Sequence, residues 1–370
     1  MNNYHRALYL CSVCTLKVLI AALNWGLGHA TRCIPLIRAL RANGHEVILA
    51  SDGSAYYLLQ AEFPELECVR LPSYRIRYEG NSMVRNMMRR LPRILYAMYA
   101  EHRAVRTLVR ERGITHIISD NRYGCYSPHA ANIFITHQLH LRVPGVWLGW
   151  AANGMMRRYL DRFDEIWVPD MPHENDNLSG ALSHPPSSEK VQYVGLLSRM
   201  SAQERSTEEP EYDVAVILSG PEPQRSHLEQ RIIEQLLSLP YKCIIVQGKP
   251  RVLRHQYLAD HIEMVSYLTS DALQQVIRRS EMIVCRSGYS SLMDLAVLGK
   301  KALLIPTPGQ TEQEYLAERL SEKGWFVARK QEEFHLDQDL ETLQRTTGFK
   351  TDNWTSDHFM DVLARLQDGA

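Results

Sequence analysis

Each half of the sequence opens in the same way, with an apolar run, a glycine turn and an amphipathic stretch. In the first half this is "KVLIAALNWGLGHATRCIPLIRAL", and in the second half it is "VAVILSGPEPQR". A buried strand that passes through a glycine turn into a helix is the building unit of a parallel sheet with helices on both faces. Because 370 residues exceed the usual size of one domain, we expect two α/β domains, each beginning with this unit.

Apolar runs and helical patterns go on alternating along both halves. In open sheets of this kind a ligand lies at the carboxyl ends of the strands, so two such domains would enclose a cleft. We expect strands at residues 18–23, 46–51, 68–71, 114–119, 131–136, 165–168, 213–218, 243–246, 262–265, 282–285 and 301–305. We expect helices at residues 30–42, 56–63, 82–112 (broken near Pro92), 225–238, 271–279, 290–298 and 312–323.

The polar segment "SRMSAQERSTEEPEYD" has no apolar periodicity, and we interpret it as a linker between the domains. The predicted organisation has five parts. They are an N-terminal extension at 1–16, a Rossmann-like domain at 17–198, the linker at 199–211, a second Rossmann-like domain at 212–350, and a C-terminal helix at 351–370 that packs back on the first domain.

The composition narrows the class of protein. Basic and acidic side chains are equal in number, and apolar residues make up 45% of the chain, as in ordinary globular proteins. No stretch reaches the roughly 18 consecutive apolar residues of a membrane-spanning helix, and the apolar run near the start is brief for a signal peptide. The seven cysteines are scattered, and no second C-x-x-C pair lies at the spacing of a zinc site. We expect a cytoplasmic protein with reduced thiols and no metal site.

The first glycine turn carries a histidine at the point where the helix begins. Gly26 and Gly28 form G-x-G, and Asp52 ends the second strand, so a nicotinamide site stays open. However, His29 would crowd a pyrophosphate, whereas it is well placed to reach a hydroxyl in a central cleft. An unperturbed imidazole is a competent base near neutral pH. Asp120 follows an apolar strand at the same edge and could orient that base.

Two structural alternatives remain open for this pair. His29 could cap the helix through its ring. Asp120 could bond its own backbone in the turn "SDNRYG".

The stretch from Met282 to Gly324 is the richest in the second half. Ser287 and Gly288 form the turn before a helix, and helix N-termini attract phosphate oxygens. Asp294 lies further along that helix and could accept from ribose hydroxyls. Gln313 and Glu314 follow a proline turn, where sugar hydroxyls could be bound.

These motifs resemble the GT-B glycosyltransferases. They are most similar to family 28, the family of the cell-wall enzyme that adds N-acetylglucosamine to a lipid-linked muramyl peptide. The resemblance covers both halves and is closest over "VCRSG", the acid six residues after its glycine, and the later Gln-(Gln/Glu)-Tyr. It implies two Rossmann-like domains facing each other across a cleft. It also implies a nucleotide-sugar co-substrate, no further cofactor and no divalent metal.

The resemblance also assigns roles to single residues. Asp294 would bind the ribose, where the family commonly has glutamate. Gln313 and Glu314 would contact the donor sugar, and because the family has two glutamines there, Glu314 leaves the identity of the sugar open. The other donor-binding residues implied are Ser219, Gly220, Arg225, Tyr267, Leu268, Arg286, Ser287 and Gly288.

In the first half, "NWGLGH" lies where the family has a glycine-rich turn ending in histidine. Small-molecule glycosyltransferases of this fold carry their catalytic histidine at this position, paired with a strand-end aspartate. The segment "THQLH", with His137 and Gln138, lacks the glutamate that the cell-wall enzymes have there, and we assign it no catalytic role.

We therefore expect an inverting transfer of a sugar from a UDP-sugar to a hydroxyl of a sugar or of a lipid-linked acceptor. His29 would take the proton of that hydroxyl. The turns at Ser219–Gly220 and Ser287–Gly288, helped by Arg286 or Arg225, would stabilise the leaving diphosphate.

Eleven arginines and only three acids lie between Arg70 and Arg112. Arg85, Arg89, Arg90 and Arg93 alternate with apolar side chains at helical spacing, which suits an anionic membrane surface, an acceptor patch, or a solvated face of a core helix. Nucleic-acid binding is not expected, because the chain is neutral and the patch lacks a stacking pattern of aromatic residues.

Three alternatives to a transferase remain at this stage. They are a non-catalytic binder of nucleotide sugars, a sugar-nucleotide epimerase of the same architecture, and a nicotinamide enzyme. The first gains weight if Asp120 points away from His29, and the second would need further acids and histidines around the sugar.

Overall fold

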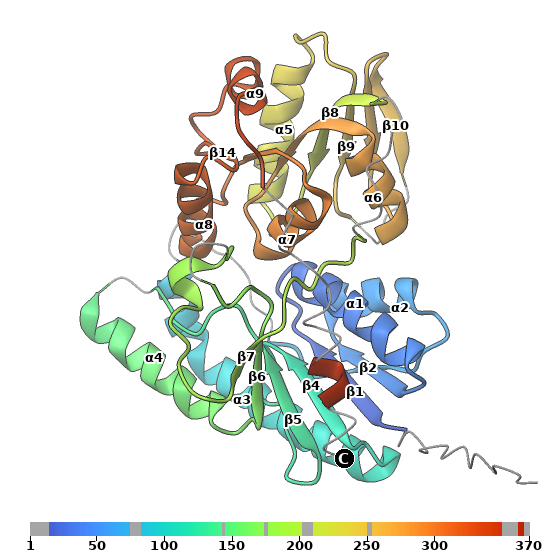
Figure 1. Ribbon diagram of the computed structural model, residues 1–370, viewed down its shortest axis with the longest axis vertical. Helices are drawn as coiled ribbons and strands as arrows, with labels where there is room; N and C mark the ends of the chain where they lie inside the picture. The colour runs from blue at the N-terminus through green and yellow to red at the C-terminus, as the bar shows by residue number, and fades with distance from the viewer. Residues whose placement is uncertain are drawn as a thin grey trace, which may run out of the picture.

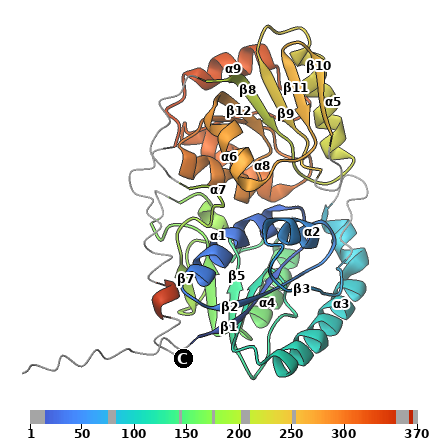
Figure 2. The ribbon, with the colours of Figure 1, turned by 90° about the vertical axis from the view of Figure 1, so that its right-hand side faces the viewer.

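The computed structural model describes residues 15–74, 83–142, 145–173, 177–201, 210–249, 254–349 and 362–365. These residues form two seven-stranded sheets, one in each half of the chain. Figures 1 and 2 show the sheets as two domains stacked one above the other, with helices on both faces of each. The predicted α/β fold with two parallel sheets is confirmed.

The N-terminal sheet is parallel throughout, in the order β3-β2-β1-β4-β5-β6-β7. Its strands β1 and β4 lie in the middle and are almost wholly buried, as strands of a doubly covered sheet must be. The strands are β1 (Lys17–Ala22), β2 (Glu46–Ser51), β3 (Cys68–Arg70), β4 (His116–Asp120), β5 (Ala131–Ile135), β6 (Glu165–Val168) and β7 (Val191–Tyr193). Since β1 pairs with β4, the turns that follow these two strands lie side by side.

The C-terminal sheet repeats this plan in the order β10-β11-β9-β8-β12-β13-β14. All of its pairings are parallel except that of β10, which runs antiparallel at the edge. The strands are β8 (Tyr212–Ile217), β9 (Cys243–Val246), β10 (His255–Ala259), β11 (Ile262–Val265), β12 (Ser280–Cys285), β13 (Ala302–Leu304) and β14 (Val327–Ala328). The glycine turns after β8 and β12 are therefore neighbours, because those strands pair directly.

The helices pack on these sheets with their apolar sides. They are α1 (Gly28–Ala42), α2 (Gly53–Glu62), α3 (Met83–Arg112), α4 (Val146–Leu160), α5 (Gln224–Leu236), α6 (Ser270–Arg278), α7 (Tyr289–Leu298), α8 (Thr311–Glu322) and α9 (Leu336–Gln344), with a 3₁₀ turn at Gly180–Leu182. The predicted break near Pro92 is wrong, because α3 runs on through this residue. A proline removes one hydrogen bond of the helix, and a long helix with a packed face can pass through it with a bend.

The sequence analysis missed some elements. Helix α4 contains Gly149 and Gly154, which lower helix propensity and mask its pattern. Strands β7 and β14 have only three and two residues, too few to show a period. Strand β10 has an irregular register with β11, which interrupts alternation.

The end of the described chain returns to the N-terminal domain. Residues 362–365 are helical, and Val362 and Leu363 are buried in the same apolar cluster as Val18 and Ile20 of β1. Figure 1 draws this short red segment against the lower domain. Most of the predicted extension (1–14), much of the linker (202–209) and residues 350–361 lie outside the described residues. Of the helices that are described, none has the length and apolar character to cross a membrane.

Candidate functional site

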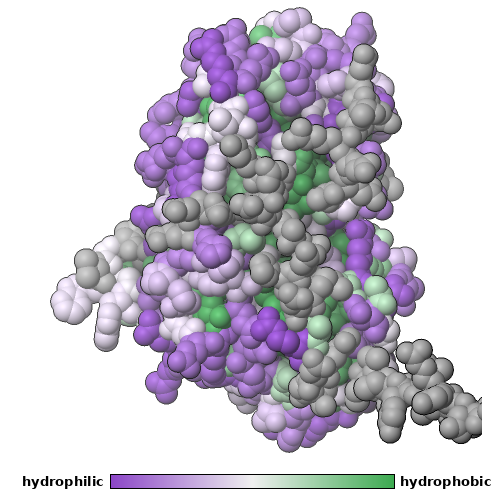
Figure 3. All heavy atoms as spheres, in the orientation of Figure 1, coloured by the Kyte–Doolittle hydropathy of each residue, from purple (hydrophilic) through white to green (hydrophobic). Residues whose placement is uncertain are grey.

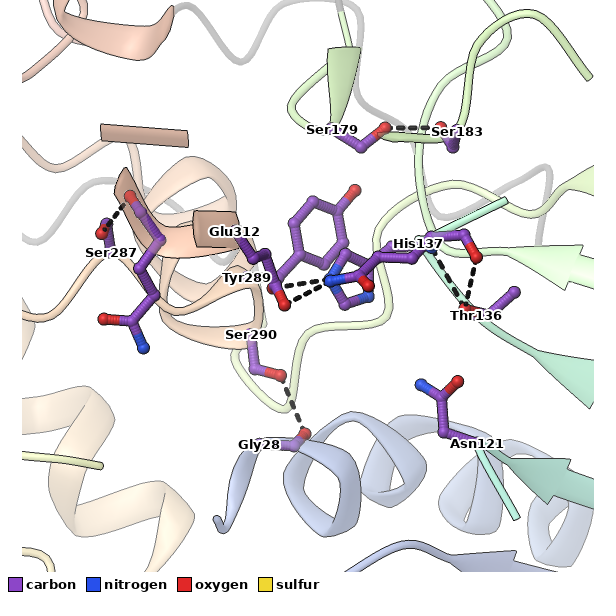
Figure 4. Close-up of polar contacts among 12 residues, drawn as sticks. Gly28, Asn121, Thr136, His137, Ser179, Ser183, Ser287, Tyr289, Ser290 and Glu312 are labelled. Atoms are coloured by element: carbon purple, nitrogen blue, oxygen red, sulfur yellow. Dashed lines mark hydrogen bonds and ion pairs between the residues drawn. The ribbon is translucent and has the colours of Figure 1, made fainter. Parts of the chain in front are cut away.

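The two domains meet where α1 of the N-terminal domain faces α7 of the C-terminal domain (Figure 2). Ser290 Oγ of α7 donates a hydrogen bond of 2.8 Å to the carbonyl of Gly28, as Figure 4 shows. A Cβ atom at Gly28 would lie 2.9 Å from Ser290 Oγ. Gly28 is therefore needed for the close approach of the domains, and the first glycine turn lies at their interface. Gly26, at φ +79°, provides the bend before it.

His29 and Asp120 form a close pair at this edge. His29 is the second residue of α1 and Asp120 the last residue of β4, and Nδ1 of His29 lies 2.7 Å from Oδ1 of Asp120. Arg32 Nη2, which only donates, also lies 3.0 Å from Nδ1 of His29. The shorter contact, with a carboxylate that only accepts, favours a proton on Nδ1, which leaves the lone pair on Nε2. The structure thus brings together the two residues that the sequence nominated as base and orienting acid. Asp120 does not point away from His29.

The surroundings of His29 favour its neutral form. Burial lowers the pKa of His29, Asp120 raises it, and Arg32 and His137 lower it again, so that the pKa lies below 6.5. The imidazole is then unprotonated near neutral pH, as a base has to be. Burial opposes the charge of Asp120, but Arg32 and His29 outweigh it and the pKa of Asp120 is lowered.

Arg32 is a residue of this site that the sequence analysis missed. Its Nε and Nη2 both donate to the Asp120 carboxylate, and its Nη1 lies 3.0 Å from Nδ1 of His137. Arg32 is only 1% exposed, although it stands one helical turn after His29 in α1. A signal existed, because an arginine between buried apolar positions of one helix needs a partner within the protein.

His137 and Gln138, which were given no catalytic role, both reach the C-terminal domain. His137 Nε2 lies 2.8 Å from Oε1 of Glu312, and Gln138 Nε2 donates to the other oxygen of this carboxylate. Glu312 stands in the first turn of α8, directly before the predicted sugar contacts Gln313 and Glu314. It is another site residue that the sequence analysis missed.

Gln313 and Glu314, the predicted sugar contacts, face different surroundings. Gln313 is buried, its Oε1 accepts from the amide of Thr307 at 2.8 Å, and its carbonyl accepts from Ser287 Oγ at 2.8 Å. A Cβ atom at Gly288 would lie 3.9 Å from Nε2 of Gln313, so the amide reaches the second glycine turn. Glu314 is exposed and accepts from the backbone of the proline turn. Among the described contacts, Gln313 is joined to the glycine turn at Ser287–Gly288, whereas Glu314 is joined to the proline turn.

The turn at Ser219–Gly220 follows β8, as predicted. Gly220 has φ +97°, a conformation that favours glycine, and a Cβ atom there would lie 3.6 Å from Thr307 Oγ1. Arg225 stands in the first turn of α5 and pairs with Glu222.

Arg286 is 1% exposed, and its guanidinium donates to the carbonyls of Ile305, Pro306 and Gln224. Burial lowers its pKa to about 10. It is thus a buried cation held by backbone dipoles close to the second glycine turn.

The predicted nucleoside-binding residues lie towards the linker. Asp294 accepts from Ser198 Oγ at 2.6 Å and from Arg199 Nε at 3.3 Å, so its carboxylate holds the start of the linker. Burial raises the pKa of Asp294. Tyr267 and Leu268 follow β11, and within the described part of the chain the Tyr267 hydroxyl has no hydrogen-bond partner. No group of three or more His, Cys, Asp or Glu side chains suited to a metal occurs among the described residues.

Comparisons with known proteins agree with this architecture. Residues 230–354 match the model of the glycosyltransferase family 28 C-terminal domain. The chain is 25% identical over 328 residues to the uncharacterized glycosyltransferase MK0977 of Methanopyrus kandleri, covering 85% of this chain and 92% of that protein. Over 137 residues it is 24% identical to the UDP-N-acetylglucosamine–N-acetylmuramyl-(pentapeptide) pyrophosphoryl-undecaprenol N-acetylglucosamine transferase of Magnetococcus marinus, covering 34% of this chain and 36% of that protein.

The fold is also similar to a solved structure, that of the spinosyn rhamnosyltransferase SpnG. The TM-score is 0.63 at 15% identity, with 95% of this chain and all of that chain covered. The same transferase complexed with thymidine diphosphate gives a TM-score of 0.55 at 15% identity, with 96% of this chain and 92% of that chain covered.

Proposed function

We propose that this chain, which is a glycosyltransferase of the GT-B type similar to family 28, transfers a sugar from a nucleoside-diphosphate sugar to a hydroxyl with inversion. The observation that carries the proposal is the contact of 2.7 Å between His29 and Asp120. The pair stands at the domain interface, opposite the helix that follows the second glycine turn. A base on one domain and an anion-binding turn on the other suit a reaction that deprotonates an acceptor and releases a diphosphate.

The chemical step is a single displacement. His29 Nε2 takes the proton of the acceptor hydroxyl as its oxygen attacks the anomeric carbon from the side opposite the diphosphate. The bond between that carbon and the diphosphate oxygen breaks, and its electron pair leaves on the diphosphate. Asp120 stabilises the imidazolium that forms. One displacement inverts the anomeric centre.

The leaving group would be stabilised by the C-terminal domain. The turns at Ser219–Gly220 and Ser287–Gly288 precede α5 and α7, whose N-termini carry partial positive charge. Arg225 adds a full charge in the first turn of α5. Fixed N–H groups at the two turns, with Arg225 released from Glu222, would support transfer without a divalent metal. Activity that survives a chelator would agree with this, and activity that magnesium restores would contradict it.

A UDP-sugar is the proposed donor, because the relative from Magnetococcus marinus is named for one. The test is a screen of UDP-, GDP- and dTDP-sugars and NAD by thermal shift, since a ligand of the native state raises its melting temperature. Productive donors are then incubated with simple alcohols, and the anomer formed is read by NMR. We expect a UDP-sugar to stabilise the protein and an α-linked donor to give a β-linked product. Retention, or stabilisation by NAD alone, would refute the proposal.

We extend the proposal to a lipid-linked acceptor at an anionic membrane surface. Trp147 and Trp150 of α4 are 85% and 77% exposed, and tryptophan side chains favour the membrane interface. Figure 3 shows pale side chains projecting at the edge where Figure 1 draws α4. Arg93 of α3 is exposed, whereas the side chains of Arg85, Arg89 and Arg90 lie outside the described residues.

The membrane contact can be tested by co-sedimentation with liposomes. We expect binding to anionic liposomes that weakens in Trp147→Ala/Trp150→Ala and is lost in neutral liposomes. Equal binding of wild type and this double variant would exclude a membrane contact through α4.

A further inference from the structure

An unbroken series of polar contacts joins His29 to the other domain. His29 contacts Asp120 at 2.7 Å, and both oxygens of Asp120 accept from Arg32. Arg32 Nη1 lies 3.0 Å from Nδ1 of His137, and Nε2 of His137 lies 2.8 Å from Glu312. The first four residues belong to the N-terminal domain, and Glu312 belongs to α8 of the C-terminal domain. The contacts at the domain interface thus extend to the atoms that orient the base.

The chemistry of the partners indicates where the ring protons of the two histidines lie. A guanidinium only donates, so Nδ1 of His137 offers a lone pair to Arg32. A carboxylate only accepts, so Nε2 of His137 carries the proton that Glu312 receives. This pattern puts the hydrogen of His137 on Nε2. Nδ1 of His29 has two such partners, Arg32 Nη2 at 3.0 Å and Asp120 Oδ1 at 2.7 Å. We assign its proton by the shorter contact, so that Asp120 receives it.

The ring of His137 is held from both domains. It stacks on Tyr289 of α7, with ring centres 4.1 Å apart and an angle of 3° between the planes (Figure 4). The Tyr289 hydroxyl donates to the carbonyl of Pro169 at 2.8 Å, which fixes the phenol in turn. The second oxygen of Glu312 accepts from Gln138. Rotation of the imidazole would break a stack and two hydrogen bonds together.

We propose that Glu312 and Arg32 are positioning residues for His29, and that docking of the C-terminal domain sets the base through them. Glu312 orients His137, His137 holds one arm of Arg32, and Arg32 fixes the Asp120 carboxylate that receives the Nδ1 proton. The lone pair of His29 then stays on Nε2, where the acceptor is deprotonated. The inference rests on the proposed role of His29 as base, while its structural half can be measured without any activity.

Glu312 is the residue to change. Arg32 is a poor target, because its loss would leave the buried charge of Asp120 with only an imidazole and the Cys33 thiol as side-chain partners among the described residues. Such losses destabilise proteins strongly. Glu312→Ala leaves the buried pair of Arg32 and Asp120 intact, so the fold should survive. Glu312→Gln keeps an acceptor for His137 and serves as the conservative variant. Glu318→Ala removes an exposed carboxylate from the same helix and is the matched control.

The first experiment reads the ring protons by ¹⁵N NMR of histidine-labelled protein at neutral pH, with His29→Asn and His137→Asn for assignment. We expect the proton of His29 on Nδ1 and that of His137 on Nε2 in the wild type, the Glu312→Gln variant and the Glu318→Ala control. In Glu312→Ala the Nδ1 form of His29 should decrease. A wild-type His29 that is protonated on Nε2, or one that does not respond to Glu312→Ala, would overturn the proposal.

The second experiment is a comparison of kcat and KM. Misplacing a catalytic group by about an ångström costs up to roughly a hundredfold in rate. Glu312 acts on His29 through three other residues, so its loss should cost less, on the order of tenfold. We expect Glu312→Ala to lower kcat by this factor with little change in the KM for the donor, and Glu312→Gln to recover most of it. A raised donor KM at unchanged kcat would mark Glu312 as a donor ligand and refute a positioning role. If the wild type transfers no sugar, the proposed function fails, while the NMR experiment still decides the proton positions.

Discussion

The two glycine turns that follow β1 and β8 share a backbone plan but differ in their surroundings. In the N-terminal domain the turn is lined by ionisable side chains that bind one another, with Asp120 between His29 and Arg32. In the C-terminal domain the turn after β8 is followed by Arg225, which pairs with Glu222. The buried cation Arg286, directly after β12, donates to backbone carbonyls and to the side-chain oxygen of Gln331. The first arrangement suits the transfer of a proton, and the second suits the binding of an anion. The same fold unit thus serves two purposes, depending on its side chains.

The largest expected effect separates these purposes. His29→Ala removes the base but leaves Asp120 paired with the buried Arg32, so the fold should be retained. A general base contributes about 10²–10⁴ in rate, and kcat should fall by roughly this factor. The dissociation constant of the nucleoside diphosphate should stay the same, because its proposed site belongs to the other domain. Steady-state kinetics measure the fall in kcat, and calorimetry measures the dissociation constant of the nucleoside diphosphate. The control is His129→Ala, at an exposed histidine. Full activity of His29→Ala would contradict the division of labour.

A smaller effect, on nucleotide binding and not on kcat, is expected at the turn after β8. Gly220 has φ +97°, so an alanine there is strained and would also approach Thr307. We expect Gly220→Ala to weaken binding of the nucleoside diphosphate by about tenfold, at a strain of about 1–2 kcal/mol. Gly44→Ala carries similar strain at φ +80° with open space around it, and is the control. If both variants bind the nucleotide equally, the turn does not hold the diphosphate.

The sequence predicted those features of the two turns that depend on neighbouring residues in the chain. Strand, glycine turn and helix follow from apolar patterning. His29 and Asp120 were nominated because the carboxyl ends of parallel strands share one edge, and the pairing of β1 with β4 brings them together. Arg286 shows the limit, because the spacing places a cation near the turn but does not say whether it points to a ligand or to carbonyls.

The residues that the sequence did not reveal depend on contacts between distant segments. Arg32 meets its partners only after β4 and the loop after β5 have folded beside α1. Glu312 meets His137 only when the two domains dock, across 175 positions of the chain. Helix α4 was missed for a different reason, since its glycines hide a helix that has formed nonetheless.

The contact between the first glycine turn and helix α7 can be measured by itself. In Gly28→Ala the new methyl group would lie 2.9 Å from Ser290 Oγ, so α1 and α7 must separate slightly. Removal of that oxygen in Ser290→Ala should relieve the crowding. Thermal unfolding of the two single variants and the double variant should therefore give a favourable coupling of about 1 kcal/mol between the sites. If the stability changes of Gly28→Ala and Ser290→Ala simply add, the two domains are not in tight contact at this point.

The smallest expected effect concerns pH. Burial, Arg32 and His137 together outweigh Asp120 and hold the pKa of His29 below 6.5. A base works unprotonated, so kcat/KM should be constant near neutral pH and decline only when the pH falls through this lowered pKa. The midpoint of the acidic limb should therefore lie below 6.5, in the pH profile of a donor that does not titrate in this range. A midpoint above 6.5 would show that Asp120 dominates the environment of His29. The N-terminal turn would then hold a charged imidazole, and the contrast between the two turns would be one of degree only.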